Sequence, residues 1–375
     1  MLVHKVKKKR ICFACFTPGN IFISYILAKT VYKDDYKILI LSDWNCTDVY
    51  FRIVENSSVW DKVILINEAG RKNRNQRFKE IRDQLRKINF DRIDVLHYIQ
   101  MNQNSYLHIL FNYIPDKTKI IATIFCKVTY YIKEHYLYAS EILRNNNIDC
   151  NIDLDRVSEI WVYDKKLYID KLFKRPVKNI EIFKYIKNKK MLNRFCNELN
   201  KIFNYRHKLM DYDVIFCDQP LKRGYFNNEM QKEKQLFSKI INEFKNYKVL
   251  VKNHHRSPYE KYKEFEVGII EENKGHVPWE LILLNELNNN ESNASNKIFV
   301  SYFSETVFTT NLFLNNLNIP HKTIRLKGIL ENHINRKIGN DMDDKFDEKF
   351  KELYGENLYD IESIDELRNT LAKFR

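Results

Sequence analysis

Residues 11–43 read ICFACFTPGNIFISYILAKTVYKDDYKILILSD, and this stretch decides the fold class. The apolar run at 11–16 has the composition of a buried strand and ends at a Pro-Gly turn. Residues 21–32 carry apolar side chains at helical spacing, and a second apolar run at 36–41 ends at Ser42 and Asp43. A strand, a helix and a further strand in this order predict a parallel β-α-β unit.

The same alternation continues through the chain on both sides of a polar, helical stretch at 179–211, which we interpret as a domain connection. Before it, we expect strands at 63–66, 94–97 and 119–125 and a helix at 73–87. After it, we expect strands at 213–217, 248–252, 267–270 and 298–301 and helices at 229–244 and 279–286.

These patterns predict an α/β protein with two Rossmann-like domains that face a cleft, with C-terminal helices packing across. The expected bounds are 1–195 for an acceptor-side domain, 205–345 for a nucleotide-sugar domain and 346–375 for the terminal helices. In glycosyltransferases such a pair of domains is called GT-B. The pattern of elements alone does not establish an activity.

The composition describes a large, basic, globular protein. The 375 residues are 44% hydrophobic, and this content excludes a disordered chain. The net charge of +14 favours an anionic partner. The seven cysteines are odd in number and scattered, as expected of reduced thiols in a cytosolic protein. The N-terminus lacks the pattern of a signal peptide, and no run approaches a membrane span, so we expect a cytoplasmic protein at most peripheral to the inner membrane.

Polar residues that follow the predicted strands are the candidates for a binding site, because ligands of open α/β sheets lie at the carboxyl ends of strands. The run VLVKNHHRSP at 249–258 places Lys252, His254, His255 and Arg256 directly after a strand. Lysine and arginine supply positive charge to a phosphate, and a histidine can donate a proton to a departing phosphate oxygen. A solvated basic turn explains the same residues about equally well.

Two further segments carry polar residues at helix starts. Pro278 lies near the start of a predicted helix and Glu280 in its first turn, where a carboxylate either favours the helix dipole or accepts hydrogen bonds from ribose hydroxyls. After the strand at 298–301, Ser304 is an N-cap candidate, with Thr306 in the same turn. Such a helix start offers N–H groups to a phosphate, although ordinary capping accounts for it as well.

The order of these three segments resembles a family pattern. K-x-H-x-R at a strand end, P-x-E-L at a helix start and S-x-T after a strand are similar to the K-P-H-P-R, P-x-E and S-S/T motifs of bacterial sialyltransferases, of the lipooligosaccharide sialyltransferase and polysialyltransferase type. The run DVIFCDQPL at 213–221 resembles their strand ending in T-Q-P-L, and TPGN at 17–20 the loop after their first strand. The resemblance covers most of the second half of the chain and fragments of the first.

The resemblance implies an inverting transfer of a sialic acid from its CMP donor to a glycan hydroxyl, with no metal and no other cofactor. His254 would assist departure of the CMP phosphate, with Lys252 and Arg256 beside it. Further nucleotide contacts would come from Gln219, Pro278, Glu280, Ser304 and Thr306. This chain has Asn253 and His255 where the family has prolines, so either His254 or His255 could face the phosphate.

The catalytic base departs further from the family pattern, which has an acidic pair followed by glycine in the first domain. The nearest counterpart here is KEHY at 133–136, so Glu134 is the predicted base, with His135 and Asp43 as the other candidates. An exposed helix charge explains Glu134 at least as well.

Two other functions compete with this interpretation. A teichoic-acid-type transferase using a CDP-alcohol would share the histidines and the two domains, but it predicts a D-Y-S-S-like motif where residues 301–304 read SYFS. A nucleic-acid-binding protein is suggested by the charge and by tyrosines such as Tyr130, Tyr131, Tyr136 and Tyr138, but these alternate with apolar residues as core residues do. We therefore expect a nucleotide-sugar donor, a glycan acceptor and an anionic membrane surface as partners, and no nucleic acid.

Overall fold

The computed structural model describes residues 8–68, 74–99, 106–123, 127–131, 154–206, 209, 211–221, 226, 230–254, 257, 259–270, 276–289 and 296–374. The chain divides into two compact units, Met1–Ile182 and Phe183–Arg375, each described here by itself. The division falls inside the stretch 179–211 that the sequence predicts as the domain connection. Each unit contains its own parallel sheet.

The first unit holds a seven-stranded sheet with the order β3-β2-β1-β4-β5-β6-β7, in which every pairing is parallel. Its strands are β1 (Arg10–Cys15), β2 (Tyr36–Ser42), β3 (Lys62–Ile66), β4 (Val95–Ile99), β5 (Lys119–Thr123), β6 (Val157–Val162) and β7 (Val177–Asn179). The chain runs outward from β1 to β3 and then returns to the other side of β1. The predicted doubly wound arrangement is therefore confirmed in this unit.

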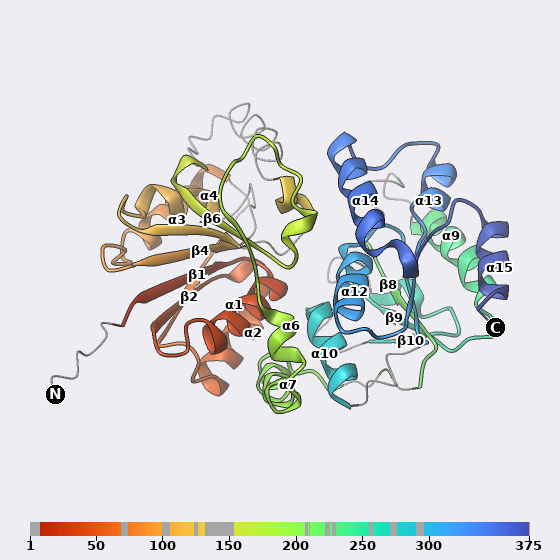
Figure 1. Ribbon diagram of the computed structural model, residues 1–375, viewed down its shortest axis with the longest axis horizontal. Helices are drawn as coiled ribbons and strands as arrows, with labels where there is room; N and C mark the ends of the chain where they lie inside the picture. The colour runs from red at the N-terminus through yellow and green to blue at the C-terminus, as the bar shows by residue number, and fades with distance from the viewer. Residues whose placement is uncertain are drawn as a thin grey trace. The chain divides into compact units, whose positions relative to one another are not determined.

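Helices cover both faces of this sheet (Figure 1). They are α1 (Pro18–Thr30), α2 (Asp43–Asn56), α3 (Arg74–Leu85) and α4 (Tyr106–Leu110), with short 3-10 turns at η1 (Phe111–Tyr113), η2 (Lys127–Tyr131), η3 (Leu154–Arg156) and η4 (Lys165–Leu167). Helices α1 and α2 pack together on one face, and α3 packs with α4 on the other. This separation follows from right-handed crossovers on the two sides of β1.

The start of α1 differs from the sequence prediction. The Pro-Gly pair was predicted as a turn, but Pro18 and Gly19 form the first turn of the helix. Thr17 is the N-cap, and its backbone N–H donates to Asn20 Oδ1 at 2.9 Å. Proline is well suited to this place because the first helical N–H groups have no partner within the helix.

The second unit holds a six-stranded, all-parallel sheet with the order β10-β9-β8-β11-β12-β13. Its strands are β8 (Val214–Cys217), β9 (Val249–Lys252), β10 (Gly268–Ile269), β11 (Ile298–Ser301), β12 (Lys322–Arg325) and β13 (Leu358–Asp360). Its helices are α7 (Lys189–Phe203), α9 (Met230–Glu243), α10 (Trp279–Asn289), α12 (Glu305–Asn316), α13 (Lys327–Ile334), α14 (Asp341–Tyr354) and α15 (Ile364–Ala372), with α6 (Ile182–Ile186) at the division and 3-10 turns at η5 (Tyr259–Tyr262) and η7 (Gly355–Asn357).

The two faces of the second sheet pack against different helices (Figure 1). One face, with Phe216 and Val251, forms an apolar core with residues of α9, α13 and α15. The opposite face, with Cys217 and Lys252, lies toward α10 and α12, since side chains of neighbouring residues in a strand point to opposite faces.

The C-terminal residues belong to the second unit, and part of them forms a strand of its sheet. The predicted helical tail at 346–375 contains β13, which pairs with β12, between α14 and α15. Helix α14 packs on α12 and α15 on α9. The predicted packing of terminal helices across both domains stays a prediction.

Several smaller expectations are confirmed where the structure describes them. Cys12, Cys15, Cys196 and Cys217 are free, buried thiols, and Tyr130 and Tyr131 are core residues. Within the described ranges, no helix combines the length and the apolar character needed to cross a bilayer.

Candidate functional site

The strand order of the second unit changes direction between β8 and β11. From β8 the chain proceeds to β9 and β10 on one side, and it returns to place β11, β12 and β13 on the other. In open α/β sheets, ligands bind outside the carboxyl ends of the strands at such a switch point. The segments that follow β8, β9 and β11 are the ones whose motifs the sequence analysis selected.

Hydrogen bonds join the ends of β8 and β11 at this switch point. Ser301 Oγ donates to the Cys217 carbonyl oxygen at 2.6 Å, and the Phe303 N–H donates to Gln219 Oε1 at 2.7 Å. Gln219, predicted as a nucleotide contact, thus lies at the switch point and holds the backbone that enters α12.

Lys252 and Glu280 interact through their charges at the same edge of the sheet. Lys252 ends β9, in register with Cys217 of β8, and Glu280 is in the first turn of α10. Burial raises the pKa of Glu280 to about 7, because desolvation outweighs a backbone hydrogen bond and the attraction of Lys252. Burial also lowers the pKa of Lys252, against the attraction of Cys217, Glu280 and Asp218. The pair is thus a carboxyl and an amine whose protonation is sensitive to a nearby charge.

Pro278 positions Glu280 in this pair. Its carbonyl oxygen accepts the N–H groups of Leu281 and Ile282 at 3.2 and 3.3 Å, so α10 begins where the sequence predicted. The Trp279 indole N–H then donates to Thr310 Oγ1 at 2.8 Å, which anchors the start of α10 on α12.

The first turn of α12 carries the two predicted hydroxyls. Ser304 is the N-cap, as predicted, and its Oγ accepts the Thr306 N–H at 3.3 Å. The Thr306 side chain lies against the Cys217 thiol, whose pKa burial raises to about 11. Lys252, Cys217 and Thr306 therefore form a continuous group on the α10/α12 face of the sheet.

His254 is held by a buried ionic network on the opposite side of the strand ends. Its backbone N–H donates to Asp218 Oδ2 at 3.2 Å. Asp218 Oδ1 accepts Lys261 Nζ at 2.7 Å and also the Tyr262 hydroxyl, and Lys261 further pairs with Glu233. Asp218, Glu233 and Lys261 are all at most 3% exposed. The sequence analysis missed this network. The position of Asp218 directly after β8 was the sole local signal for it, and that position does not identify Lys261 or Glu233 as partners.

Three predicted residues of the second unit therefore share this edge of the sheet. Lys252 and Thr306 both adjoin Cys217, and Glu280 interacts with Lys252 through its charge. Gln219, Pro278, Ser304 and His254 support the same strand ends. The predicted residues Arg256 and Glu134, and the alternatives His255 and His135, lie outside the described residues.

The carboxyl edge of the first unit carries a pair of acids. Asp43, the third candidate for a base, starts α2, and its Oδ1 accepts the Glu68 N–H at 2.7 Å. Glu68 follows β3, is fully buried, and its Oε2 accepts the Tyr106 N–H at 3.0 Å. Burial raises the pKa of Glu68 to about 7, against hydrogen bonds from Ser42 and Tyr106 and the attraction of Arg77. The sequence analysis did not select Glu68, although it follows a predicted strand.

Comparison with known proteins supports the fold. Neither a protein-family model nor a curated protein sequence matches the chain. A solved UDP-N-acetylglucosamine 2-epimerase is similar with a TM-score of 0.51 at 11% identity, covering 98% of this chain and 87% of that one. MurG of Acinetobacter baumannii is similar with a TM-score of 0.46 at 8% identity, covering 98% of this chain and 90% of that one. MnaA of S. aureus, solved with UDP, is similar with a TM-score of 0.46 at 10% identity, covering 98% of this chain and 96% of that one.

With two successive parallel α/β units of Rossmann type, the chain has the GT-B type of fold.

Proposed function

We propose that the chain is an inverting glycosyltransferase that moves a sialic acid, or a related nonulosonate, from its CMP donor to a glycan hydroxyl in lipooligosaccharide or capsule synthesis. The observation that carries the proposal is the group formed by Lys252, Glu280 and Thr306 at the switch point of the second sheet. The motifs at 252–256, 278–281 and 304–306, which resemble those of sialyltransferases, contribute the residues of this group.

Each side chain would have a separate task around the nucleotide. Lys252 offers positive charge to the phosphate at the end of β9, and the start of α12 offers its dipole. The Ser304 hydroxyl accepts the Thr306 N–H, and its own proton remains available for a phosphate oxygen. His254 would donate a proton to the departing phosphate, and Glu280 would accept hydrogen bonds from the ribose.

The acceptor would be deprotonated by a base of the first domain. Glu134 remains the base that the resemblance implies, and Asp43 lies at the carboxyl edge of the first sheet beside Glu68. Side chains and helix dipoles neutralise the leaving phosphate in this proposal, so it calls for no metal. The basic surface would attach the protein peripherally to an anionic membrane, where glycolipid acceptors are found.

A thermal-shift experiment tests the nucleotide site. The melting temperature is measured with CMP, CDP, UMP and single-stranded RNA, because a ligand that binds the folded state stabilises it by about 2.7 kcal/mol at 100 times its Kd. We expect selective stabilisation by CMP that is lost in Lys252→Ala and His254→Ala. Lys248→Ala is the matched control, since Lys248 is exposed and lies at the opposite end of the same strand.

The other outcomes identify the competing functions. Stabilisation by CDP without CMP would support the CDP-alcohol transferase, and stabilisation by RNA alone would reject a glycosyltransferase. Stabilisation by UMP would indicate that the donor carries a uridine nucleotide instead of a cytidine nucleotide. Release of CMP from CMP-sialic acid in the presence of a glycan acceptor then tests the transfer itself.

A further inference from the structure

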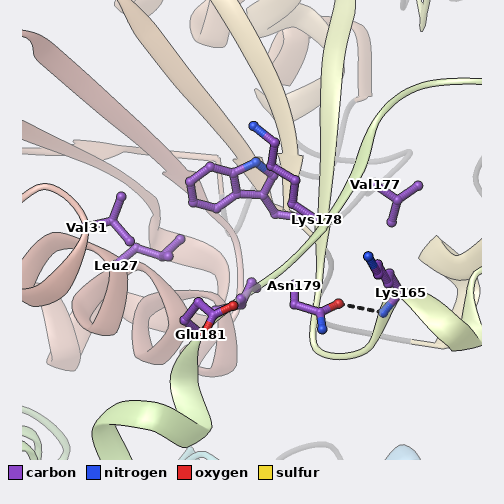
Figure 2. A pocket seen from close by; sticks show the side chains of 9 residues that line it. Leu27, Val31, Lys165, Val177, Lys178, Asn179 and Glu181 are labelled. Atoms are coloured by element: carbon purple, nitrogen blue, oxygen red, sulfur yellow. Dashed lines mark hydrogen bonds between the residues drawn. The ribbon is translucent and has the colours of Figure 1, made fainter.

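A pocket of about 430 Å³ opens on the first domain between α1 and the edge formed by β6 and β7 (Figure 2). Its volume falls in the range of about 300–1,000 Å³ typical of small-ligand sites. Leu27 of α1 and Val31, the C-cap of that helix, form an aliphatic wall, and Trp161 of β6 lines the pocket as well. Every lining residue belongs to the first unit, so the pocket is separate from the nucleotide site proposed above.

Trp161 is held in one orientation by its surroundings. Its indole N–H donates to Glu159 Oε2 at 2.9 Å, and its ring stacks on Tyr32 with centroids 6.3 Å apart and an interplanar angle of 8°. The Tyr32 hydroxyl bonds in turn to His97 Nε2 at 2.7 Å. A partly exposed indole that is fixed in this way loses little conformational entropy when a ligand packs against it.

The charges near the pocket are arranged so that its rim stays cationic. Glu159 is bound by Lys119 Nζ at 2.6 Å and by Lys178 Nζ at 3.0 Å. Although burial opposes ionisation, these bonds and that of Trp161 lower the pKa of Glu159 to about 2. Three lysines, Lys119, Lys165 and Lys178, thus stand against two carboxylates, Glu159 and Glu181, and one positive charge remains in excess.

This combination of surfaces matches the chemistry of an acidic sugar. One face of a pyranose ring carries C–H groups that pack on an indole ring, whose π-face is electron-rich. The ring edge carries hydroxyls, and a uronic or nonulosonic acid adds a carboxylate that lysines can bind. An aliphatic carboxylate could use the wall and a lysine, but it lacks the ring that packs on the indole, so it is the alternative ligand that a test must exclude.

We propose that this pocket binds an acidic saccharide, as the part of the acceptor glycan that does not react. The identification of the ligand as acceptor rests on the proposed glycosyl transfer. Binding of an acidic sugar to the pocket follows from the lining residues themselves.

Titration calorimetry on the full-length chain tests the proposal with three probes: sialyllactose, lactose and octanoate. We expect sialyllactose to bind more tightly than lactose, and octanoate not to bind. Val31→Glu should weaken sialyllactose binding by about tenfold or more, because the larger side chain extends into the pocket from its exposed rim and its charge repels the carboxylate of the ligand. Val54→Glu is the matched control, since Val54 is an exposed valine of α2 in the same domain (57%, against 45% for Val31) outside the pocket.

A second variant tests the charge without altering the packing. Lys165→Gln should weaken sialyllactose by a few-fold, as expected for an exposed ion pair, and leave lactose unchanged. The proposal is overturned if neither sugar binds, if lactose binds as tightly as sialyllactose, if Val31→Glu binds as the parent does, or if octanoate alone binds. These titrations contain no nucleotide, so sugar binding without CMP binding would reject the proposed function alone, and the reverse would reject the pocket alone.

Discussion

Replacement of Glu280 by glutamine separates the two roles that its position allows. Glu280 is 3% exposed, and its pKa is raised from 4.5 to about 7, chiefly by burial. The folded protein therefore keeps a proton that the unfolded chain releases above pH 4.5. The resulting stability is fully present below pH 4.5 and is lost as the pH rises to 7.

The size of this effect follows from the two pKa values. Since one pH unit corresponds to about 1.4 kcal/mol, the difference between 4.5 and about 7 amounts to about 3 kcal/mol. Glutamine resembles the neutral carboxyl and does not titrate. Glu280→Gln should therefore match the parent at pH 4.5 and exceed its free energy of unfolding by about 3 kcal/mol at pH 8.5.

Urea denaturation of both proteins at the two pH values measures this difference, with Glu348→Gln as control because Glu348 is exposed in the same domain. A CMP titration of the same proteins measures the functional role. Loss of hydrogen bonds to a charged acceptor should weaken CMP binding by about 1.5–3 kcal/mol. A stability difference that is equal at both pH values would refute the argument from burial, and unchanged CMP binding would leave Glu280 as an internal partner of Lys252 only.

Three further predictions concern other parts of the chain. Glu68→Gln should stabilise the first domain by about 3 kcal/mol above pH 7 and not at pH 4.5, measured by the same denaturation series, since its pKa is raised to about 7 by burial. Lys261→Met should lower the free energy of unfolding of the second domain by about 3–5 kcal/mol, because it leaves Asp218 and Glu233 buried without their cation; a loss below 1 kcal/mol would contradict this. Cosedimentation with anionic vesicles should fall as salt rises, with about 1 kcal/mol per basic residue near the surface, and neutral vesicles should not bind.

Most of the strands that the sequence predicted are apolar runs, although the predicted strands β3 and β10 are only partly buried. Strands β1, β2, β8, β9 and β11 are nearly continuous apolar runs, because helices cover both sides of a parallel sheet. The missed strands are β6, β7, β12 and β13, which read VSEIWV, VKN, KTIR and LYD. They are short or interrupted by polar residues, and such segments become strands through pairing with a neighbour already in place. Helix α2 was also missed; it begins at Asp43 directly after β2 ends at Ser42, so no loop separates the two elements in the sequence.

The candidate site was predictable in position but not in its contacts. Lys252, Glu280 and Thr306 were selected because they follow strands or begin helices, and that rule depends on local sequence. The pairing of Lys261 with Asp218 and Glu233 depends on how η5, β8 and α9 meet, which no local pattern encodes. The same applies to Glu68, whose raised pKa results from complete burial.

The bond between Gln219 and the Phe303 amide has a kinetic counterpart that can be observed directly. An amide in a connecting segment usually exchanges its hydrogen with solvent quickly, but this one is held by a side chain from another strand end. Its exchange should be as slow as that of strand amides, and should accelerate in Gln219→Ala. Because this bond orders the backbone before a nucleotide binds, association of a nucleotide there should carry a small entropic penalty.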